Sequence, residues 1–219
     1  MARKVATKVK KKKKTWIKIL APPIFDNKEI GETLVLEPED ALNRVVEVYL
    51  FNLTMNPRHQ EGKMAFKITE IRGDEALTKI IGYEMINAFV KRIVKKRTDR
   101  VDVSEVYLTK DREVVRVKPL VITASNTSYS VRKAIRHTMS EFIKEKLENL
   151  TYEGFIKEFI SGKLERELFD RVSKIYPVKY AKIRKFELIE GIEKEKFLRI
   201  FDTLYGKKEE KQEEKIEAQ

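Results

Sequence analysis

Hydrophobic and polar residues alternate along much of the first two thirds of the chain. The pattern is clearest over residues 63–84, where Met64, Phe66 and Ile68 are separated by small or polar residues. Such alternation is typical of a strand with one buried and one solvent-exposed face in an antiparallel sheet. The pair Gly73-Asp74 interrupts the pattern, so the sequence predicts two strands joined by a turn at that point.

Other segments have the β-branched and aromatic composition of strands. The sequence predicts strands in WIKIL (16–20), IGETLVLE (30–37), RVVEVYLFNL (44–53, expected to be buried) and VKYAKIRKFELIE (178–190), and a hairpin over 100–124 turning near Lys110-Asp111. The stretches APPIFDN and NPRHQEG (56–62) are expected to be an irregular link and a loop.

Apolar residues at helical spacing predict five helices. One covers 83–97, and one begins near Ser128 and continues to Leu150. The others cover 151–161, 164–176 (ended by Pro177) and 193–205 (closed by Gly206). The fold class is therefore α+β: a mostly antiparallel sheet or β-barrel-like core with flanking helices.

The domain organisation follows from the same pattern. We expect a basic disordered arm over 1–15 and a charged tail over 207–219, because both have almost nothing to bury. Between them lies a single α+β domain, 16–206, which is sheet-rich over 16–124 and helix-rich over 125–206 with one returning strand.

The charge is concentrated at the N-terminus. Of the formal net charge of +12, nine positive charges and no negative ones lie in residues 1–18, at Arg3, Lys4, Lys8, Lys10, Lys11, Lys12, Lys13, Lys14 and Lys18. Such a run favours a polyanionic partner, either nucleic acid or an anionic membrane surface. No apolar run is long enough to span a bilayer, and the absence of Cys fits a reducing compartment.

Residues suited to catalysis are scarce. The two histidines, His59 and His137, are far apart and lack metal-ligand spacing, and we expect His59 to be exposed in a polar loop. No phosphate-binding glycine motif or nucleophile motif is present, and the cluster Glu37, Glu39 and Asp40 is expected to be a surface turn. The sequence therefore favours no enzymatic activity, no metal, no cofactor and no small-molecule substrate.

The start of the helix after Ser128 carries an unusual charge pattern. Arg132, Lys133 and Arg136 lie in its first two turns, where the positive end of the helix dipole favours anions. A docked phosphate would reverse this mismatch, with Ser128 donating a hydroxyl and Tyr129 stacking on a base. We therefore predict that RNA binds here and that its phosphate is the anion this helix start requires, which this chain does not itself supply.

Two other groups of cations are candidate RNA contacts, each with an alternative. Arg92, Lys95, Lys96 and Arg97 end the helix predicted over 83–97, where cations also complement the helix dipole. Lys182, Arg184 and Lys185 lie on the strand predicted over 178–190, where they could instead protect a sheet edge from pairing. The sequence leaves both alternatives open.

Four blocks resemble one known family. WIKILAPPIFDNKEIGETLV, KRIVKKRTDRVDVSEVYL, TSYSVRKAIRHTM and KIYPVKYAKIRKFELI occur in the order found in the small-subunit ribosomal protein S-three-A-e family, also called S-one-e, of archaea and eukaryotes. The resemblance extends from about Trp16 to Ile192, and the short arm before Trp16 is similar to that of archaeal members.

This resemblance implies a cytoplasmic, non-catalytic constituent of the 30S subunit that supports translation. Family members bind small-subunit ribosomal RNA on the platform, near the RNA 3′ end and the mRNA exit, beside neighbouring ribosomal proteins. A β-barrel-like core is also implied. The alternatives are an architectural nucleic-acid-binding protein outside the ribosome and an RNA-processing enzyme.

Overall fold

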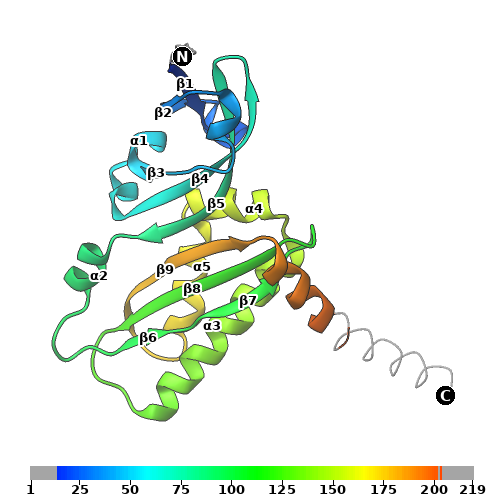
Figure 1. The fold of residues 1–219 in the computed structure, drawn as a ribbon. Helices are drawn as coiled ribbons and strands as arrows, with labels where there is room; N and C mark the ends of the chain where they lie inside the picture. The colour runs from blue at the N-terminus through cyan, green and yellow to red at the C-terminus, as the bar shows by residue number, and fades with distance from the viewer. Residues whose placement is uncertain (1–13, 202, 204–219) are drawn as a thin grey trace, which may run out of the picture. The chain divides into compact units, whose positions relative to one another are not determined.

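The computed structural model describes residues 14–201 and 203, which divide into two compact units (Figure 1). Unit 1 holds the described residues up to Gln60 together with Met64–Ile81. Unit 2 holds Glu61–Lys63 and the described residues from Gly82 onward. The predicted arm over 1–15 and tail over 207–219 lie almost wholly outside the described residues, and the single domain expected over 16–206 stays a prediction.

Unit 1 is built on strands that surround an apolar core. The strand order is β2-β1-β5-β4-β3, in which β1 pairs antiparallel with β2 but parallel with β5. Ile17 and Ile19 on β1 pack in the core with Val35 and Ile68. The strands that contribute to this unit are β1 (Thr15–Leu20), β2 (Glu29–Val35), β3 (Val45–Tyr49), β4 (Gly62–Arg72) and β5 (Glu75–Met85).

The predicted hairpin over 63–84 is confirmed. Met64, Phe66 and Ile68 are fully buried on β4 while the residues between them are partly exposed. Gly73 adopts a left-handed conformation with φ of 64°, which a glycine reaches without steric cost. The turn therefore lies where the sequence placed it.

The buried strand predicted over 44–53 is wrong in its second half and in its burial. β3 ends at Tyr49 and alternates between exposed and half-buried residues. The chain then forms a short helix, in which the Thr54 hydroxyl donates to the Leu50 carbonyl at 3.0 Å. Hydrogen bonds within one helical turn form after Tyr49, because no partner strand extends far enough to pair with these residues. The short helices of this region are η1 (Pro23–Phe25), η2 (Pro38–Ala41), α1 (Leu50–Thr54) and η3 (Pro57–Glu61), the last within the predicted loop.

Unit 2 is built on antiparallel strands packed against helices. β8 pairs antiparallel with β9, β6 and β7, and β9 also pairs antiparallel with the end of β5. Phe155 and Phe159 of α4 pack edge-to-face against Phe186 of β9, with ring centroids 5.5 and 5.2 Å from that of Phe186. The elements are α2 (Asn87–Ile93), β6 (Arg100–Asp102), β7 (Glu105–Leu108), β8 (Val114–Thr123), α3 (Tyr129–Asn149), α4 (Tyr152–Ile160), α5 (Lys163–Ser173) and β9 (Val178–Ile189).

The helix predicted over 83–97 is shorter than expected. Residues 83–85 instead belong to β5, where Tyr83 lies opposite Phe186 of β9. The helix α2 ends because Val94 is extended, with φ of −79° and ψ of 113°. Lys95, Lys96 and Arg97 therefore lie on a loop rather than on a helix.

The remaining helices agree with the sequence. Ser128 caps α3 by accepting a hydrogen bond from the Val131 N–H, and Thr151 caps α4 through the Gly154 N–H at 3.1 Å. A last helix covers 192–201, and the rest of the helix predicted over 193–205 is largely outside the described residues. The α+β class with a mostly antiparallel sheet is confirmed. None of the helices in the described part of the chain has the length and apolarity needed to span a bilayer.

Candidate nucleic-acid interface

The N-terminus of α3 is held by the loop that follows α2. The Asp99 carboxylate accepts hydrogen bonds from the Thr127 N–H at 2.7 Å and the Thr127 hydroxyl at 2.8 Å. The Asp99 N–H donates to the buried Thr123 hydroxyl at 2.9 Å, at the end of β8. The cations of the loop, which immediately precede Asp99, are therefore brought to the start of α3.

Asp99 corrects the expectation that this chain supplies no anion at the start of α3. The hydrogen bonds from the Thr127 backbone and hydroxyl lower the pKa of the Asp99 carboxyl, and the positive charge of Arg132 lowers it further. Asp99 is thus ionised at neutral pH and interacts with Arg132. One of the three cations in the first two turns of α3 has a counter-charge within the chain.

A third segment reaches the same end of unit 2. Tyr176, just after α5, has its hydroxyl within hydrogen-bond distance of the Ser125 hydroxyl. The Ala124 N–H donates to the Pro177 carbonyl at 2.9 Å. Lys174 and Lys179 are the cations that flank Pro177. These contacts therefore place both of them beside the segment that leads into α3.

We call this convergence the basic end. It comprises Lys95, Lys96, Arg97, Arg132, Lys133, Arg136, Lys174 and Lys179. Except for Arg132, these side chains are exposed and make no hydrogen bond or ion pair with a described residue. Tyr129 on α3 and Tyr180 on β9 are 67% and 39% exposed at the same end. Exposed cations interleaved with exposed aromatic rings are suited to bind phosphates and bases.

The cations predicted on β9 form ion pairs within the chain. The Lys182 ammonium lies 2.8 Å from a Glu61 oxygen and 2.9 Å from a Glu165 oxygen, and its side chain is 22% exposed. Burial alone would lower the pKa of Lys182, but the two carboxylates outweigh it and raise that pKa. Burial raises the pKa of Glu165 despite the neighbouring ammonium. Lys182 therefore neutralises two carboxylates of the same chain, and its assignment to RNA stays a prediction.

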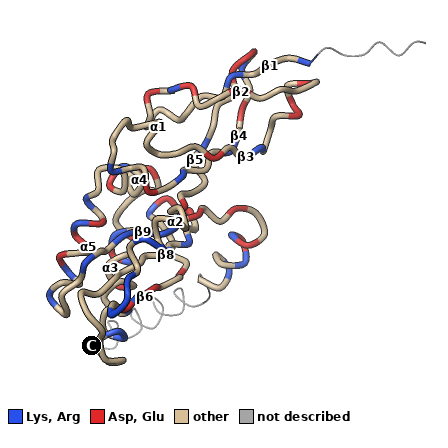
Figure 2. Tube along the Cα trace, turned by 90° about the vertical axis from the view of Figure 1, so that its left-hand side faces the viewer, with Lys and Arg blue, Asp and Glu red and all other residues tan. Residues whose placement is uncertain are grey.

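Lys185 and Arg184 also have internal partners. Lys185 lies 3.0 Å from Glu187 and 3.4 Å from Glu84, and Arg184 lies 3.8 Å from Asp102. The alternative of edge protection stays open for Lys182 and Arg184, because β9 pairs with β8 along its length but with β5 only over residues 185–187. Figure 2 shows blue basic positions near the label of β9, and the ion pairs of Lys182, Arg184 and Lys185 tie these three cations to other parts of the fold.

The other predicted contacts are distributed over both units. Arg3, Lys4, Lys8, Lys10, Lys11, Lys12 and Lys13 lie outside the described residues. Lys14 is exposed before β1, and Lys18 on β1 is 3.5 Å from Glu29. Arg92 is exposed on α2 with its guanidinium 4.7 Å from the centre of the Phe89 ring. The first-turn positions Ser128 and Tyr129 are exposed on α3.

Sequence reasoning missed Lys174, Tyr176 and Tyr180. Their neighbours in sequence give no signal, because a single cation after a helix and single tyrosines near Pro177 are ordinary. Only the pairing of β8 with β9, which sets Ile122 opposite Tyr180, brings them to the start of α3.

The histidines do not form a catalytic arrangement. The His59 ring Nδ1 lies 2.7 Å from the Thr54 hydroxyl and the ring is half-buried, which corrects the exposed position expected for it. His137 is exposed on α3, 3.1 Å from Glu141 one turn later. Within residues 14–201 and 203, no group of three His, Asp or Glu is arranged to hold a metal ion.

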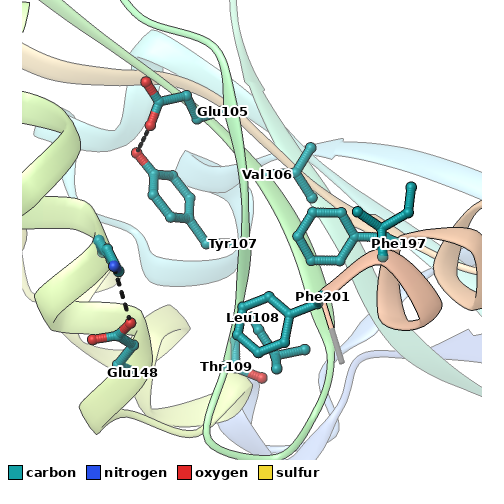
Figure 3. Close-up of a pocket in the computed structure, with 10 residues that line it drawn as sticks. Glu105, Val106, Tyr107, Leu108, Thr109, Glu148, Phe197 and Phe201 are labelled. Carbon is teal, nitrogen blue, oxygen red and sulfur yellow. Dashed lines mark hydrogen bonds and ion pairs between the residues drawn. The ribbon is translucent and has the colours of Figure 1, made fainter. Parts of the chain in front are cut away.

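A cavity of about 480 Å³ lies in unit 2 between β7, the second half of α3 and the helix over 192–201 (Figure 3). Its walls are mainly apolar, formed by Val106, Leu108, Phe197 and Phe201 among others. Polar side chains in the wall have partners within the chain: the Tyr107 hydroxyl donates a hydrogen bond to Glu105 at 2.9 Å, and the Lys144 ammonium lies 3.8 Å from the Glu148 carboxylate. Burial, together with Glu105, raises the pKa of the Tyr107 hydroxyl, so this group is no base at neutral pH.

Comparison with known proteins identifies the family. The model of the ribosomal S3Ae family matches residues 2–191. The chain is 38% identical to the small ribosomal subunit protein eS1 of Methanothrix thermoacetophila, over 87% of this chain and 91% of that protein. It is 32% identical to the eS1 proteins of Halorubrum lacusprofundi and Saccharolobus islandicus, over 81% and 83% of this chain and 83% and 88% of those proteins. The chain therefore belongs to the ribosomal S3Ae family.

Proposed function

We propose that this chain is a structural component of the small ribosomal subunit and binds small-subunit ribosomal RNA. The observation that carries the proposal is the basic end, where seven cations without a partner among the described residues converge from three segments. Membership of the S3Ae family and relatives named small ribosomal subunit protein eS1 support the ribosomal setting. The role is structural and cytoplasmic rather than catalytic.

The start of α3 supplies the phosphate-binding chemistry. A helix N-terminus attracts an anion through its dipole and its free N–H groups. Lys133 and Arg136 add positive charge there, and Arg136 follows Arg132 by one helical turn. The Asp99 carboxylate neutralises part of the positive charge at the start of α3, near Arg132. Phosphate binding at this end therefore depends mainly on the cations that Asp99 does not face.

The finer placement is proposed from the resemblance of the sequence blocks. It comprises a position on the platform, near the RNA 3′ end and the mRNA exit, beside neighbouring ribosomal proteins. The runner-up, an architectural nucleic-acid-binding protein outside the ribosome, predicts that duplex DNA competes as well as folded ribosomal RNA does.

Sedimentation of a cell lysate tests the proposed function. We expect the chain to travel with 30S particles through a sucrose gradient and to stay with them at physiological ionic strength. An excess of duplex DNA should not release it. Recovery of the chain only in the light fractions, or its release by duplex DNA, would show that the ribosomal proposal is wrong.

Deleting residues 2–14 should weaken the salt dependence of RNA binding. This segment contains eight cations and no acid, and each neutralised phosphate contributes about 0.7 to 0.9 to the slope of log affinity against log salt concentration. We expect the slope to become shallower by several units while the melting temperature is unchanged. Titrations at four salt concentrations measure it, and equal slopes for parent and truncated chain would exclude the arm as a phosphate binder.

A further inference from the structure

Large apolar side chains are exposed on the outer face of β1 and β2 in unit 1. Trp16 lies directly opposite Leu34 in the antiparallel pair, so the two side chains share a face. They are 61% and 37% exposed, and Leu36, which follows β2, is 48% exposed. The neighbouring residues Ile17 and Val35 are buried in the core on the opposite face. We call Trp16, Leu34 and Leu36 the apolar strip.

The strip is not needed for the core of unit 1. Ile17, Ile19 and Val35 already supply the inward face of the two strands. A Trp and two Leu held in water together are unusual on a monomer surface, and such a patch indicates an interaction site. Tryptophan is also among the residues that contribute most to binding at protein interfaces.

The charge around the strip decides which class of partner fits. The described residues of unit 1, 14–60 and 64–81, contain eight Lys and Arg against ten Asp and Glu, and residues 1–13 add seven cations. The described residues of unit 2 contain 28 against 19. Near the strip, Glu32 shares the outer face of β2 and lies opposite Lys18 of β1, and three more acids follow Leu36: Glu37, Glu39 and Asp40.

We propose that the apolar strip docks a basic protein of the small subunit, not RNA. The apolar side chains would bury against apolar residues of that partner, and the acids at the margin would face its cations. RNA fits less well, because the acids repel phosphate and because Leu34 and Leu36, unlike Trp16, offer neither a stacking surface nor a hydrogen bond to a base. This inference rests on the proposed ribosomal function, and it assigns protein contact to the apolar strip and RNA contact to the arm before Thr15 and to the basic end of unit 2.

The test compares two probes at one fixed salt concentration. One is small-subunit ribosomal RNA freed of protein, and the other is the 30S particle from which this chain has been removed by a salt wash. The variant Trp16→Thr with Leu34→Thr keeps strand-forming residues on β1 and β2. We expect it to bind the particle at least tenfold more weakly than the parent does, and to bind the free RNA within twofold of the parent.

A charge variant guards against an effect of misfolding. Glu32→Lys with Glu39→Lys leaves the strip intact and should weaken particle binding several-fold, because the added cations face a basic partner. The same variant should bind free RNA as well as the parent or better. Val45→Thr, at a 52% exposed position on β3 of the same unit, is the matched control and should change neither affinity.

Three outcomes would overturn the inference. An equal loss on both probes by the Trp16 and Leu34 variant would show that the strip contacts RNA. Unchanged affinity for both probes would show that the strip binds nothing in the particle. Tighter particle binding by the Glu32 and Glu39 variant would show that its partner is not basic. Failure of the parent itself to bind either probe would instead contradict the proposed function.

Discussion

Reversing three cations at the basic end should weaken binding to small-subunit ribosomal RNA about a hundredfold or more, at roughly 1–3 kcal/mol for each lost contact. The changes are Lys95→Glu, Lys133→Glu and Arg136→Glu. All three side chains are exposed and without a partner among the described residues, so the free energy of unfolding should change little. Affinity from filter binding and stability from urea unfolding should be measured on the same preparation.

A matched control separates position from net charge. Lys110→Glu, Lys157→Glu and Lys196→Glu cause the same change in charge in the same unit, at exposed positions away from the start of α3. The Lys110 N–H bonds to the Leu150 carbonyl, which marks the opposite end of that helix. This control should lose only the small affinity that follows from net charge. Equal losses in both triple variants would contradict a localised interface.

Asp99→Asn should change RNA affinity in the opposite direction. Asp99 places a negative charge beside Arg132, so removing it releases the Arg132 guanidinium for phosphate and should tighten binding a few-fold. Arg132 is left unchanged in the triple variant for the same reason, because Arg132→Glu would set a second carboxylate beside Asp99 and lower stability. Weaker RNA binding by Asp99→Asn would show that the bonds of Asp99 to Thr127 matter more than its charge.

Lys182→Met should destabilise the protein by about 2–4 kcal/mol at pH 7, because removing one partner leaves two carboxylates poorly solvated and uncompensated. The side chains of Lys182, Glu61 and Glu165 are only 22%, 21% and 19% exposed. We place the loss below that of a fully buried ion pair, since water still reaches these groups. Urea unfolding at pH 7 measures it.

The destabilisation should depend on pH. Burial raises the pKa of Glu165 in the folded parent, and loss of Lys182 would raise it further. A carboxyl with a raised pKa in the folded state is unfavourable when ionised, so the cost is present above that pKa and disappears as the pH falls through it. The deficit of the variant should therefore shrink between pH 7 and about pH 4.5, the ordinary value for glutamate.

Lys179→Met is the control for this substitution. Lys179 is exposed on the same strand and has no ion pair with a described residue, so its replacement should change the free energy of unfolding by less than about 0.5 kcal/mol. A deficit for Lys182→Met that is equally large at pH 4.5 would indicate lost packing of the lysine stem instead of unpaired carboxylates.

Features set by local sequence were predicted well. The turn at Gly73, the cap at Ser128 and the start of α4 each depend on residues within one or two turns of the chain. Their signals are conformational: a glycine that reaches positive φ, or a hydroxyl that satisfies a free N–H group. The strand β9 was also found, because its alternation is regular over 178–190.

Local pattern failed where a distant partner competes for the same residues. Residues 83–85 fit a helical period, but pairing with β9 draws them into β5. The apolar run after Tyr49 reads as a strand, yet no neighbouring strand extends that far and a helical turn forms instead. In both cases hydrogen bonds to elements far away in the sequence, or their absence, outweighed local preference.

The sequence by itself determined the α+β class, the family resemblance, the concentration of cations in the arm and the charged start of α3. Tertiary structure decided which cations are available. It paired Lys182 with Glu61 and Glu165, and it brought Asp99 to Arg132 and Lys174 to the start of α3. A side chain's charge is a property of one residue, whereas its counter-charge is set by the fold, because the opposing groups lie 17 to 121 residues away in the sequence.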